Sequence, residues 1–151
     1  LALAERLVGA STVLVPERQD DAGTGAAVRD LTEGEGADLV VNATGFPGSI
    51  HTAFRIVRDA GTIVEVGAFV DMGDEAFNPA QICGRSLNII GIGGEHPNAY
   101  YGTMQLLKRH TEIPFADMVS HKFRVDDAAL ALETSLDAMN ATKVLITNAM
   151  T

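Results

Sequence analysis

The sequence predicts an α/β fold built on a mostly parallel β-sheet. Short runs rich in Val, Ile and Leu alternate with amphipathic stretches that are long enough to form helices. The strand-like runs are apolar almost throughout, which is typical of parallel strands covered on both faces. With 46% hydrophobic and 21% charged residues, the 151-residue chain can bury a core, and this excludes intrinsic disorder.

The first part of the chain alternates helix and strand. A helix-favouring stretch at 1–8 stops before Gly9, a residue suited to a left-handed helix cap. Asp20 and Asp21 place acidic side chains at the start of the next helix, where the helix dipole favours negative charge. The further elements that we expect are a strand at 13–15, a helix at 21–33, a strand at 39–41, a helix at 49–58 that buries Ile50, Phe54 and Val57, and a strand at 62–66.

The second part continues in the same way. We expect a strand at 87–92, and Pro97 suits the first position of the helix that follows. The pattern places Tyr100, Met104 and Leu107 on the buried stripe of that helix. The remaining expected elements are an extended segment at 118–125, a helix capped by Asp126 and Asp127 whose inner face is Leu132, Leu136 and Met139, and a last strand at 144–147.

Small residues follow three of the predicted strands, at 42–45, 67–69 and 91–94. Ligands of parallel sheets bind beyond the carboxyl ends of the strands, and small residues there let a flat ligand approach the backbone. The alternative is that such turns need glycine for their geometry alone. The residues by themselves leave both interpretations open.

Composition excludes several classes of protein. The 11 basic and 20 acidic residues give a net charge of −9, which disfavours binding to nucleic acid. One cysteine, Cys83, excludes an internal disulfide framework, and we expect it to be a small buried hydrophobe. No apolar run approaches the length of a membrane span, and the first residues contain Glu5 and Arg6 and no signal-peptide pattern. We therefore expect a cytoplasmic protein.

No catalytic residue and no metal ligand can be named from the residues. The Gly23-Thr24-Gly25 turn lacks the third glycine of a dinucleotide fingerprint, and no complete G-x-G-x-x-G occurs in the chain. The four histidines do not form a metal-binding motif. Ser120 and His121 adjoin on an apparent strand, so their side chains are expected on opposite faces.

Seven segments in order resemble the medium-chain, zinc-dependent alcohol dehydrogenase family, nearest to its polyol and threonine dehydrogenase branch. They are the stretch 1–10, the run 36–45 (GADLVVNATG), the helix 53–58, the strand 61–67 (GTIVEVG), Asn78-Pro79 with the strand 87–91 (LNIIG), the run 119–123 (VSHKF) and the strand 143–146 (KVLI). One departure is Asp59-Ala60-Gly61, where the family usually has Pro-Gly-Gly.

The resemblance implies a partial doubly wound, Rossmann-like α/β fold, from which the N-terminal strands and the catalytic domain are missing. Residues 1–94 would be the second half of the dinucleotide-binding domain, and residues 95–151 would pack against the cofactor and catalytic domains. The family's zinc ligands and Gly-rich fingerprint precede this stretch, so the chain would hold only part of an NAD(P) site and no zinc ligand. Alone, it would be an inactive fragment of an enzyme that passes hydride between an alcohol or polyol and NAD(P).

The resemblance also implies roles for six residues. Asn42, Ala43 and Thr44 would flank the adenosine end of NAD(P), Gly67 and Ala68 would face the carboxamide, and the backbone near Ile92 would lie beside the nicotinamide. The strand between Asn88 and Gly93 would pair subunits edge to edge. In the strand order 3-2-1-4-5-6, loss of strands 1 and 2 also leaves an apolar strand without a neighbour, so we expect a dimer or larger oligomer.

Two alternatives remain at this point. The chain could be a non-catalytic nucleotide-binding or dimerisation module that never had an active site. It could also come from a zinc-free relative of the quinone reductases. Sequence upstream of residue 1 would distinguish them.

Overall fold

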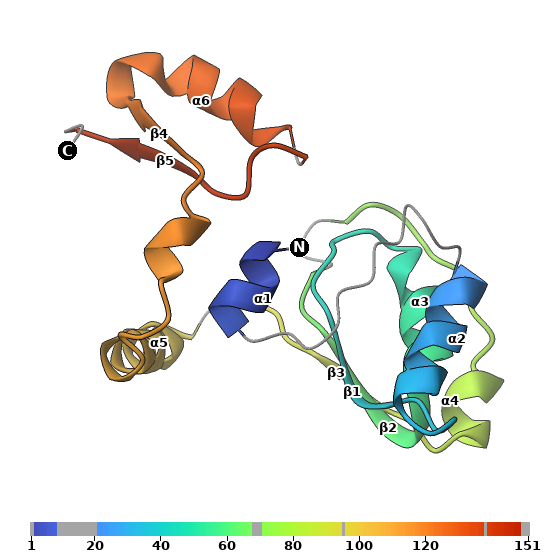
Figure 1. The fold of residues 1–151 in the computed structure, drawn as a ribbon. Helices are drawn as coiled ribbons and strands as arrows, with labels where there is room; N and C mark the ends of the chain where they lie inside the picture. The colour runs from blue at the N-terminus through green and yellow to red at the C-terminus, as the bar shows by residue number, and fades with distance from the viewer. Residues whose placement is uncertain (1, 9–20, 68–70, 95, 138, 149–151) are drawn as a thin grey trace. The chain divides into compact units, whose positions relative to one another are not determined.

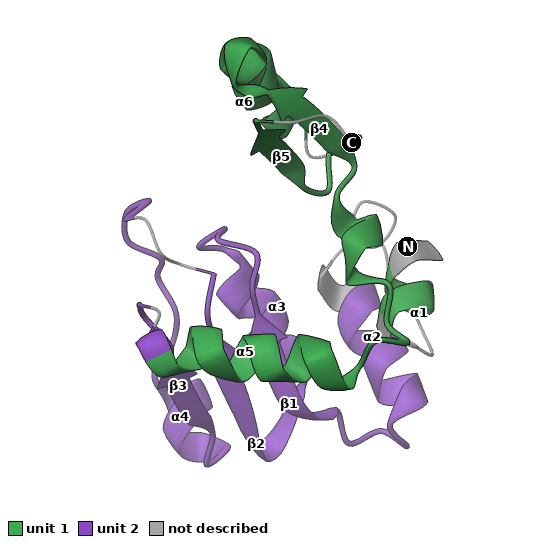
Figure 2. Ribbon diagram, turned by 90° about the vertical axis from the view of Figure 1, so that its left-hand side faces the viewer, with its two compact units in different colours: residues 1–13, 98–151 green, residues 14–97 purple. Residues whose placement is uncertain are grey.

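The computed structural model describes residues 2–8, 21–67, 71–94, 96–137 and 139–148. The chain divides into two compact units: residues 14–97, called here the sheet unit, and residues 1–13 with 98–151, called the second unit (Figures 1 and 2). The expected cap at Gly9 and the expected strand at 13–15 lie outside the described residues. No helix in the described part of the chain is long and apolar enough to cross a membrane.

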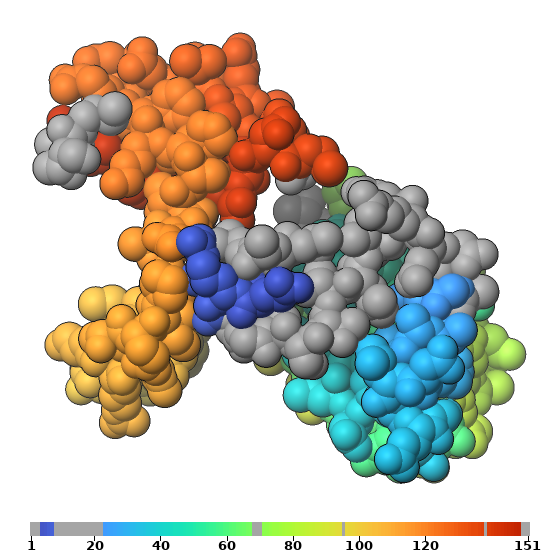
Figure 3. All heavy atoms as spheres, viewed as in Figure 1, coloured from blue at the N-terminus to red at the C-terminus, as the bar shows by residue number. Residues whose placement is uncertain are grey.

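The sheet unit contains a parallel sheet, as predicted, and three of its strands lie among the described residues. Its order is β1-β2-β3, with Leu39 opposite Thr62 and Val64 opposite Ile90. The strands are β1 (Ala37–Asn42), β2 (Val57–Glu65) and β3 (Asn88–Gly91), and the helices are α2 (Asp21–Leu31), α3 (Ser49–Ile56) and α4 (Ala80–Gly84). Helix α2 forms part of the outer surface of this unit (Figure 3). Each connection between successive strands carries a helix, which is how parallel strands must be joined.

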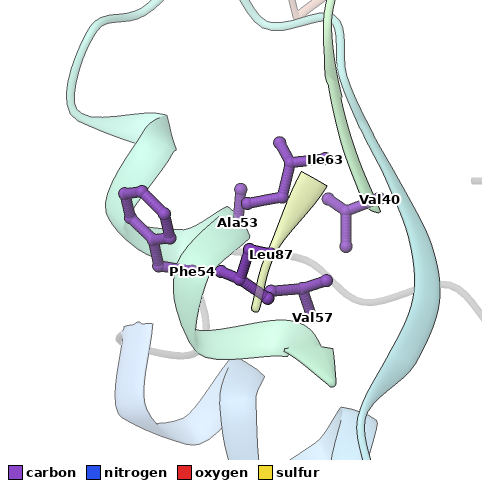
Figure 4. Packing of buried hydrophobic residues seen from close by; sticks show 6 residues of the cluster. All are labelled: Val40, Ala53, Phe54, Val57, Ile63 and Leu87. Atoms are coloured by element: carbon purple, nitrogen blue, oxygen red, sulfur yellow. The ribbon is translucent and has the colours of Figure 1, made fainter. Parts of the chain in front are cut away.

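The core of the sheet unit lies between α3 and the sheet. Its buried members, drawn in Figure 4, are Val40, Ala53, Phe54, Val57, Ile63 and Leu87. Burial of Phe54 and Val57 confirms two of the three residues predicted for this face, and Ile50 is partly buried.

Helix α3 is shorter than predicted. It ends at Ile56 because Val57 has extended backbone (φ −71°, ψ 142°) and begins β2 directly. Arg58 therefore belongs to β2, where its Nε lies 2.6 Å from Asp38 Oδ1.

One face of β1 is exposed, contrary to the expectation of two covered faces. Val40 and Asn42 are buried, whereas Leu39 and Val41, which alternate with them, are each 57% exposed. On β3, Ile90 and the following Ile92 are also exposed. Helices α2 and α3 pack against each other, and α3 contacts β1 and β2. The packing of α3 accounts for the burial of Val40 and Asn42. Leu39 and Val41, on the other face of β1, are not covered by any described residue to the same extent.

The second unit contains a parallel pair of strands. Its elements are α1 (Ala2–Val8), α5 (Pro97–Arg109), the 3-10 turn η2 (Phe115–Met118), β4 (His121–Arg124), η3 (Val125–Asp127), α6 (Ala128–Ser135) and β5 (Val144–Thr147), with β4 paired to β5. The N-terminal helix, the start of α5 at Pro97 and the last strand are confirmed. The segment predicted to be extended is a strand only at 121–124.

Both predicted buried stripes of this unit are wrong. Tyr100, Met104 and Leu107 of α5 are exposed, the first by 60%. Leu132 is exposed as well, and Leu136 and Met139 lie beyond the end of α6 at Ser135. The small Ala131 is buried instead, because a close-packed helix needs a short side chain where it meets the sheet. Asp127 holds the N-cap position without a side-chain capping hydrogen bond.

Candidate functional site

The carboxyl ends of β1 and β2 meet at one place. Asn42 and Glu65 are register partners, and the backbone amides of Val66 and Gly67 both donate to the carbonyl of Asn42, at 2.9 and 3.1 Å. Residues 42–45 and Gly67, which we call the shelf, are therefore adjacent. Two of the three predicted small-residue turns are brought together.

Glycine is required at position 67. A Cβ atom there would lie 2.4 Å from the backbone nitrogen of Gly45 and 2.7 Å from that of Thr44. Real Cβ atoms essentially never approach so closely, so only glycine allows the two segments to pack. Gly45 has φ of +70°, in the left-handed region that glycine adopts without strain. The result is that two strand ends with small residues at positions 43, 45 and 67 pack closely at the carboxyl end of the sheet.

A polar network lies beneath the shelf. Asn42 is buried, and its Nδ2 donates to Glu65 Oε2 at 2.5 Å and to Ser49 Oγ at 2.7 Å. Thr44 Oγ1 lies 3.0 Å from Asn42 Oδ1, and the backbone amide of Gly67 donates to Glu65 Oε1 at 3.0 Å. Side chains from β1, β2 and the start of α3 thus stabilise the shelf by hydrogen bonds.

The third predicted turn joins the site through the backbone. The amide of Ile92 donates to the carbonyl of Glu65 at 2.9 Å, which extends the β2–β3 pairing beyond Gly91. The Ile92 side chain is 54% exposed. Ala43 and Thr44 are also exposed, whereas Ala68 lies outside the described residues.

Two cavities adjoin the shelf. One of about 480 Å³ runs between β1 and the helices α2 and α3, and its walls include Thr24, Val41 and Ile56. The other, of about 340 Å³, lies between the start of α3 and the loop at 71–77. Both volumes fall in the range of small-molecule sites. The described residues that line the smaller cavity include Glu65, Asp71 and Glu75 and no Lys or Arg, so this part of its wall disfavours a phosphate group.

The described residues do not fit a zinc site. Within the part of the chain that the structure describes, no three His, Cys, Asp or Glu side chains come together to hold a metal ion. Two histidines instead pair with carboxylates: His51 with Glu75 at 2.7 Å and His110 with Glu112 at 2.9 Å. Cys83 is exposed, so its prediction as a buried hydrophobe is wrong.

Ser120 and His121 do not point to opposite faces as predicted. Ser120 precedes β4, and its Oγ lies 3.0 Å from His121 Nδ1. The hydroxyl is held by the backbone, since it donates to the carbonyl of Lys143 and accepts from the amide of Thr142. The hydrogen bonds of Ser120 therefore stabilise the turn that leads into the β4–β5 pair. These bonds are typical of a structural serine rather than of a nucleophile.

Sequence reasoning missed Ser49 and Glu65. Nothing in their spacing from Asn42 marks them, because the contacts depend on strand register and on where α3 begins. One signal was available for Glu65: a charged residue directly follows the apolar pair Ile63-Val64, where it needs a hydrogen-bonding partner.

A parallel sheet joined by helices, with a glycine-dependent shelf at its carboxyl end, is a partial Rossmann-like α/β fold. The chain belongs to the zinc-binding dehydrogenase family, whose model matches residues 1–109. This agrees with the resemblance seen in the sequence.

Individual relatives are similar over much of the chain. 5-exo-Hydroxycamphor dehydrogenase from Pseudomonas putida is 30% identical over 99 residues, which are 65% of this chain and 27% of that protein. L-Threonine 3-dehydrogenase from Pyrococcus furiosus is 26% identical over 90% of this chain and 37% of its own length. The crystal structure of an alcohol dehydrogenase from Thermotoga maritima covers 97% of this chain with a TM-score of 0.85, and this chain covers 40% of it at 23% identity. The chain thus spans well under half the length of these relatives.

Proposed function

We propose that this chain is part of an NAD(P)-dependent alcohol or polyol dehydrogenase and that the shelf supports the cofactor. The observation that carries the proposal is the close packing of Gly67 against the backbone of residues 43–45, which brings together two strand ends with small or absent side chains. A flat ring can approach such a surface closely. The family match and the names of the relatives support the same activity.

We propose roles for residues of the shelf and for the neighbouring Ala68 and Ile92. The adenosine end lies beside Ala43 and Thr44, the carboxamide faces Gly67 and Ala68, and the nicotinamide lies beside the backbone near Ile92. When bound, the nicotinamide exchanges hydride with the carbinol carbon of the substrate. This chain binds and orients the cofactor. No step is assigned to zinc, because the described residues do not fit that metal.

The proposal is tested by NMR titration of the ¹⁵N-labelled chain. Nicotinamide mononucleotide is expected to shift the amide signals of Gly67 and Ile92, and ADP those of Ala43 and Thr44. Binding of whole NADH is expected to be weak, since no fingerprint loop is present to hold the pyrophosphate. An absence of shifts at millimolar ligand, or shifts confined to other residues, would contradict the proposal.

We also propose that the 151 residues have no dehydrogenase activity alone. The described residues contribute a binding surface, and we assign no acid or base to them. Purified protein mixed with NAD and a panel of primary alcohols, polyols and threonine is expected to give no increase in absorbance at the NADH wavelength. Reduction of NAD above the rate without protein would contradict this proposal while leaving the shelf assignment intact.

The edge of β3 away from β2, with which no described strand pairs, is proposed as a subunit contact. Because Ile92 donates to Glu65, alternation of the backbone along the strand directs the amides of Ile89 and Gly91 away from β2. Ile89 and Ile90 are 39% and 49% exposed. An unpaired apolar edge of this kind favours pairing with a second chain.

A further inference from the structure

We propose that Glu65 is the positioning residue of the shelf, and that Asn42 acts through Glu65 rather than by touching the ligand. The inference deepens the proposed function and rests on it. It changes the role predicted for Asn42, which was expected to flank the adenosine end of NAD(P).

The chemistry of the two side chains fixes their orientation. A carboxylate only accepts hydrogen bonds, so the amide nitrogen of Asn42, and not its oxygen, must face Glu65. That nitrogen lies 2.5 Å from Glu65 Oε2 and 2.7 Å from Ser49 Oγ, which uses both of its donors. The amide oxygen faces Thr44 Oγ1 at 3.0 Å. With Asn42 only 7% exposed, its polar atoms are bonded to protein groups, and the residue also lines the larger cavity.

The two oxygens of Glu65 act on two different segments. Oε2 holds the side chain at the end of β1, while Oε1 accepts the backbone amide of Gly67 at 3.0 Å. Gly67 in turn packs against residues 43–45 without room for a Cβ. One carboxylate therefore sets the position of both shelf segments relative to each other.

A charged group is suited to this task. Hydrogen bonds to an ionised acceptor are shorter and stronger than neutral ones, and they hold their donors in a narrow geometry. The neutral amide of a glutamine can satisfy only one of the two contacts. If its oxygen accepts from Gly67, its nitrogen faces the nitrogen of Asn42, and two donors meet.

The test exchanges the polarity of the pair. Glu65→Gln and Asn42→Asp each spoil the contact, the first by opposing two donors and the second by opposing two carboxylates. The double variant Asn42→Asp/Glu65→Gln restores it, because the glutamine nitrogen now donates to the aspartate while its oxygen still accepts from Gly67. Glu35→Gln is the matched control, since Glu35 is an exposed residue of the same unit with the same charge and size.

Two quantities are measured in each variant: the amide hydrogen-exchange rates of Thr44 and Gly67, and the response of the shelf signals to nicotinamide mononucleotide. Each single variant is expected to raise both exchange rates about tenfold, because loss of the Asn42–Glu65 contact loosens the shelf, although the Gly67 amide keeps the Asn42 carbonyl as a second acceptor. The double variant is expected to return them to within about threefold of the parent, and Glu35→Gln to leave them unchanged. The apparent Kd for nicotinamide mononucleotide is expected to rise in each single variant, to return towards the parent value in the double variant and to stay unchanged in Glu35→Gln.

The inference is overturned if Glu65→Gln leaves exchange and Kd unchanged, or if the double variant is no closer to the parent than the single ones. If Asn42→Asp does not fold, the exchange rates and the Kd of Glu65→Gln are compared with those of the double variant. The inference is overturned if the double variant is no closer to the parent. The two proposals can fail separately. If the shelf signals of the parent chain do not respond to nicotinamide mononucleotide, the proposed function is overturned. The positioning role is still supported if the exchange rates rise in the single variants and recover in the double variant.

Discussion

The guanidinium of Arg85 donates to the backbone carbonyl of Phe54 at 2.6 Å, which ties the last turn of α3 to the segment before β3. It also donates to the carbonyl of Val57, and its Nε lies 2.7 Å from Asp59 Oδ1. The carbonyls at the end of a helix lack partners within the helix and carry negative partial charge, so a cation there is favourable. The Arg85 side chain thus links α3 and β2 to the segment before β3.

Replacing this cation is expected to destabilise the sheet unit. Arg85→Met keeps much of the aliphatic stem but leaves two carbonyls without their charged donor, which should cost about 2 kcal/mol of unfolding free energy. Urea denaturation followed by circular dichroism measures the change. Arg55→Met is the control, because Arg55 is an exposed arginine of α3, the helix whose Phe54 carbonyl Arg85 binds. Equal midpoints for the two variants would show that the Arg85 contacts add nothing.

Ala60 stands in a strained backbone conformation. Its φ is +56°, in the left-handed region that costs a residue with a Cβ about 1–2 kcal/mol. We expect Ala60→Gly to raise the unfolding free energy by about 0.5–1 kcal/mol, since glycine relieves this strain but loses more entropy on folding. Thermal unfolding measures it. In the helix α6, Ala129→Gly should do the opposite by a similar amount.

The close packing of Gly67 can be tested by a single methyl group. Gly67→Ala forces a Cβ into the space of the Gly45 nitrogen, so the shelf must open, and we expect a loss of about 2 kcal/mol or more. Gly93→Ala is the control, because a Cβ there meets nothing within 4 Å. Urea midpoints and the amide spectra of residues 43–45 are compared. If both substitutions have the same effect, the two shelf segments are not packed as described.

Association of the chain is expected to depend on β3. Light scattering at micromolar concentration should give the mass of a dimer or larger oligomer, and Ile90→Lys should reduce it, because a charge on an edge strand opposes pairing. Leu39→Lys places the same charge on β1 and shows whether that edge is used instead. Leu39 is 57% exposed, so the substitution disturbs no core. A monomeric parent chain would contradict the prediction.

The pKa of Asp137 is lowered from its ordinary value, chiefly by the hydrogen bond from Asn140 Nδ2 at 2.8 Å. A carboxyl group with a lowered pKa in the folded state stabilises that state at pH above its unfolded pKa, and the benefit is lost as pH falls through the folded pKa. Asn140→Ala is expected to raise the Asp137 pKa, as measured by NMR titration of the carboxyl carbon. The pKa of Glu112, lowered by its own backbone amide and by His110, is the internal control.

The fold class and the site of the shelf were predictable from local patterns. Apolar runs at 39–41 and 62–66 followed by small residues indicate parallel strands that end at a ligand edge, and the structure confirms that these strands are parallel. The buried stripes of the second unit were not predictable in this way. Periodicity shows that a helix has an apolar face but not that a neighbour covers it, and Met104 and Leu132 remain exposed in the described structure.

By itself, the sequence determined the α/β class, the parallel strands, the family and the turns that make up the shelf, because these depend on residues close together in the chain. Only the tertiary structure decided that Glu65, 23 residues after Asn42, meets it and Gly67 at one point. It also decided that α3 ends at Ile56 and that Ser120 reaches the backbone of Lys143. Strand register and helix placement produce these contacts, and they depend on how distant segments pack.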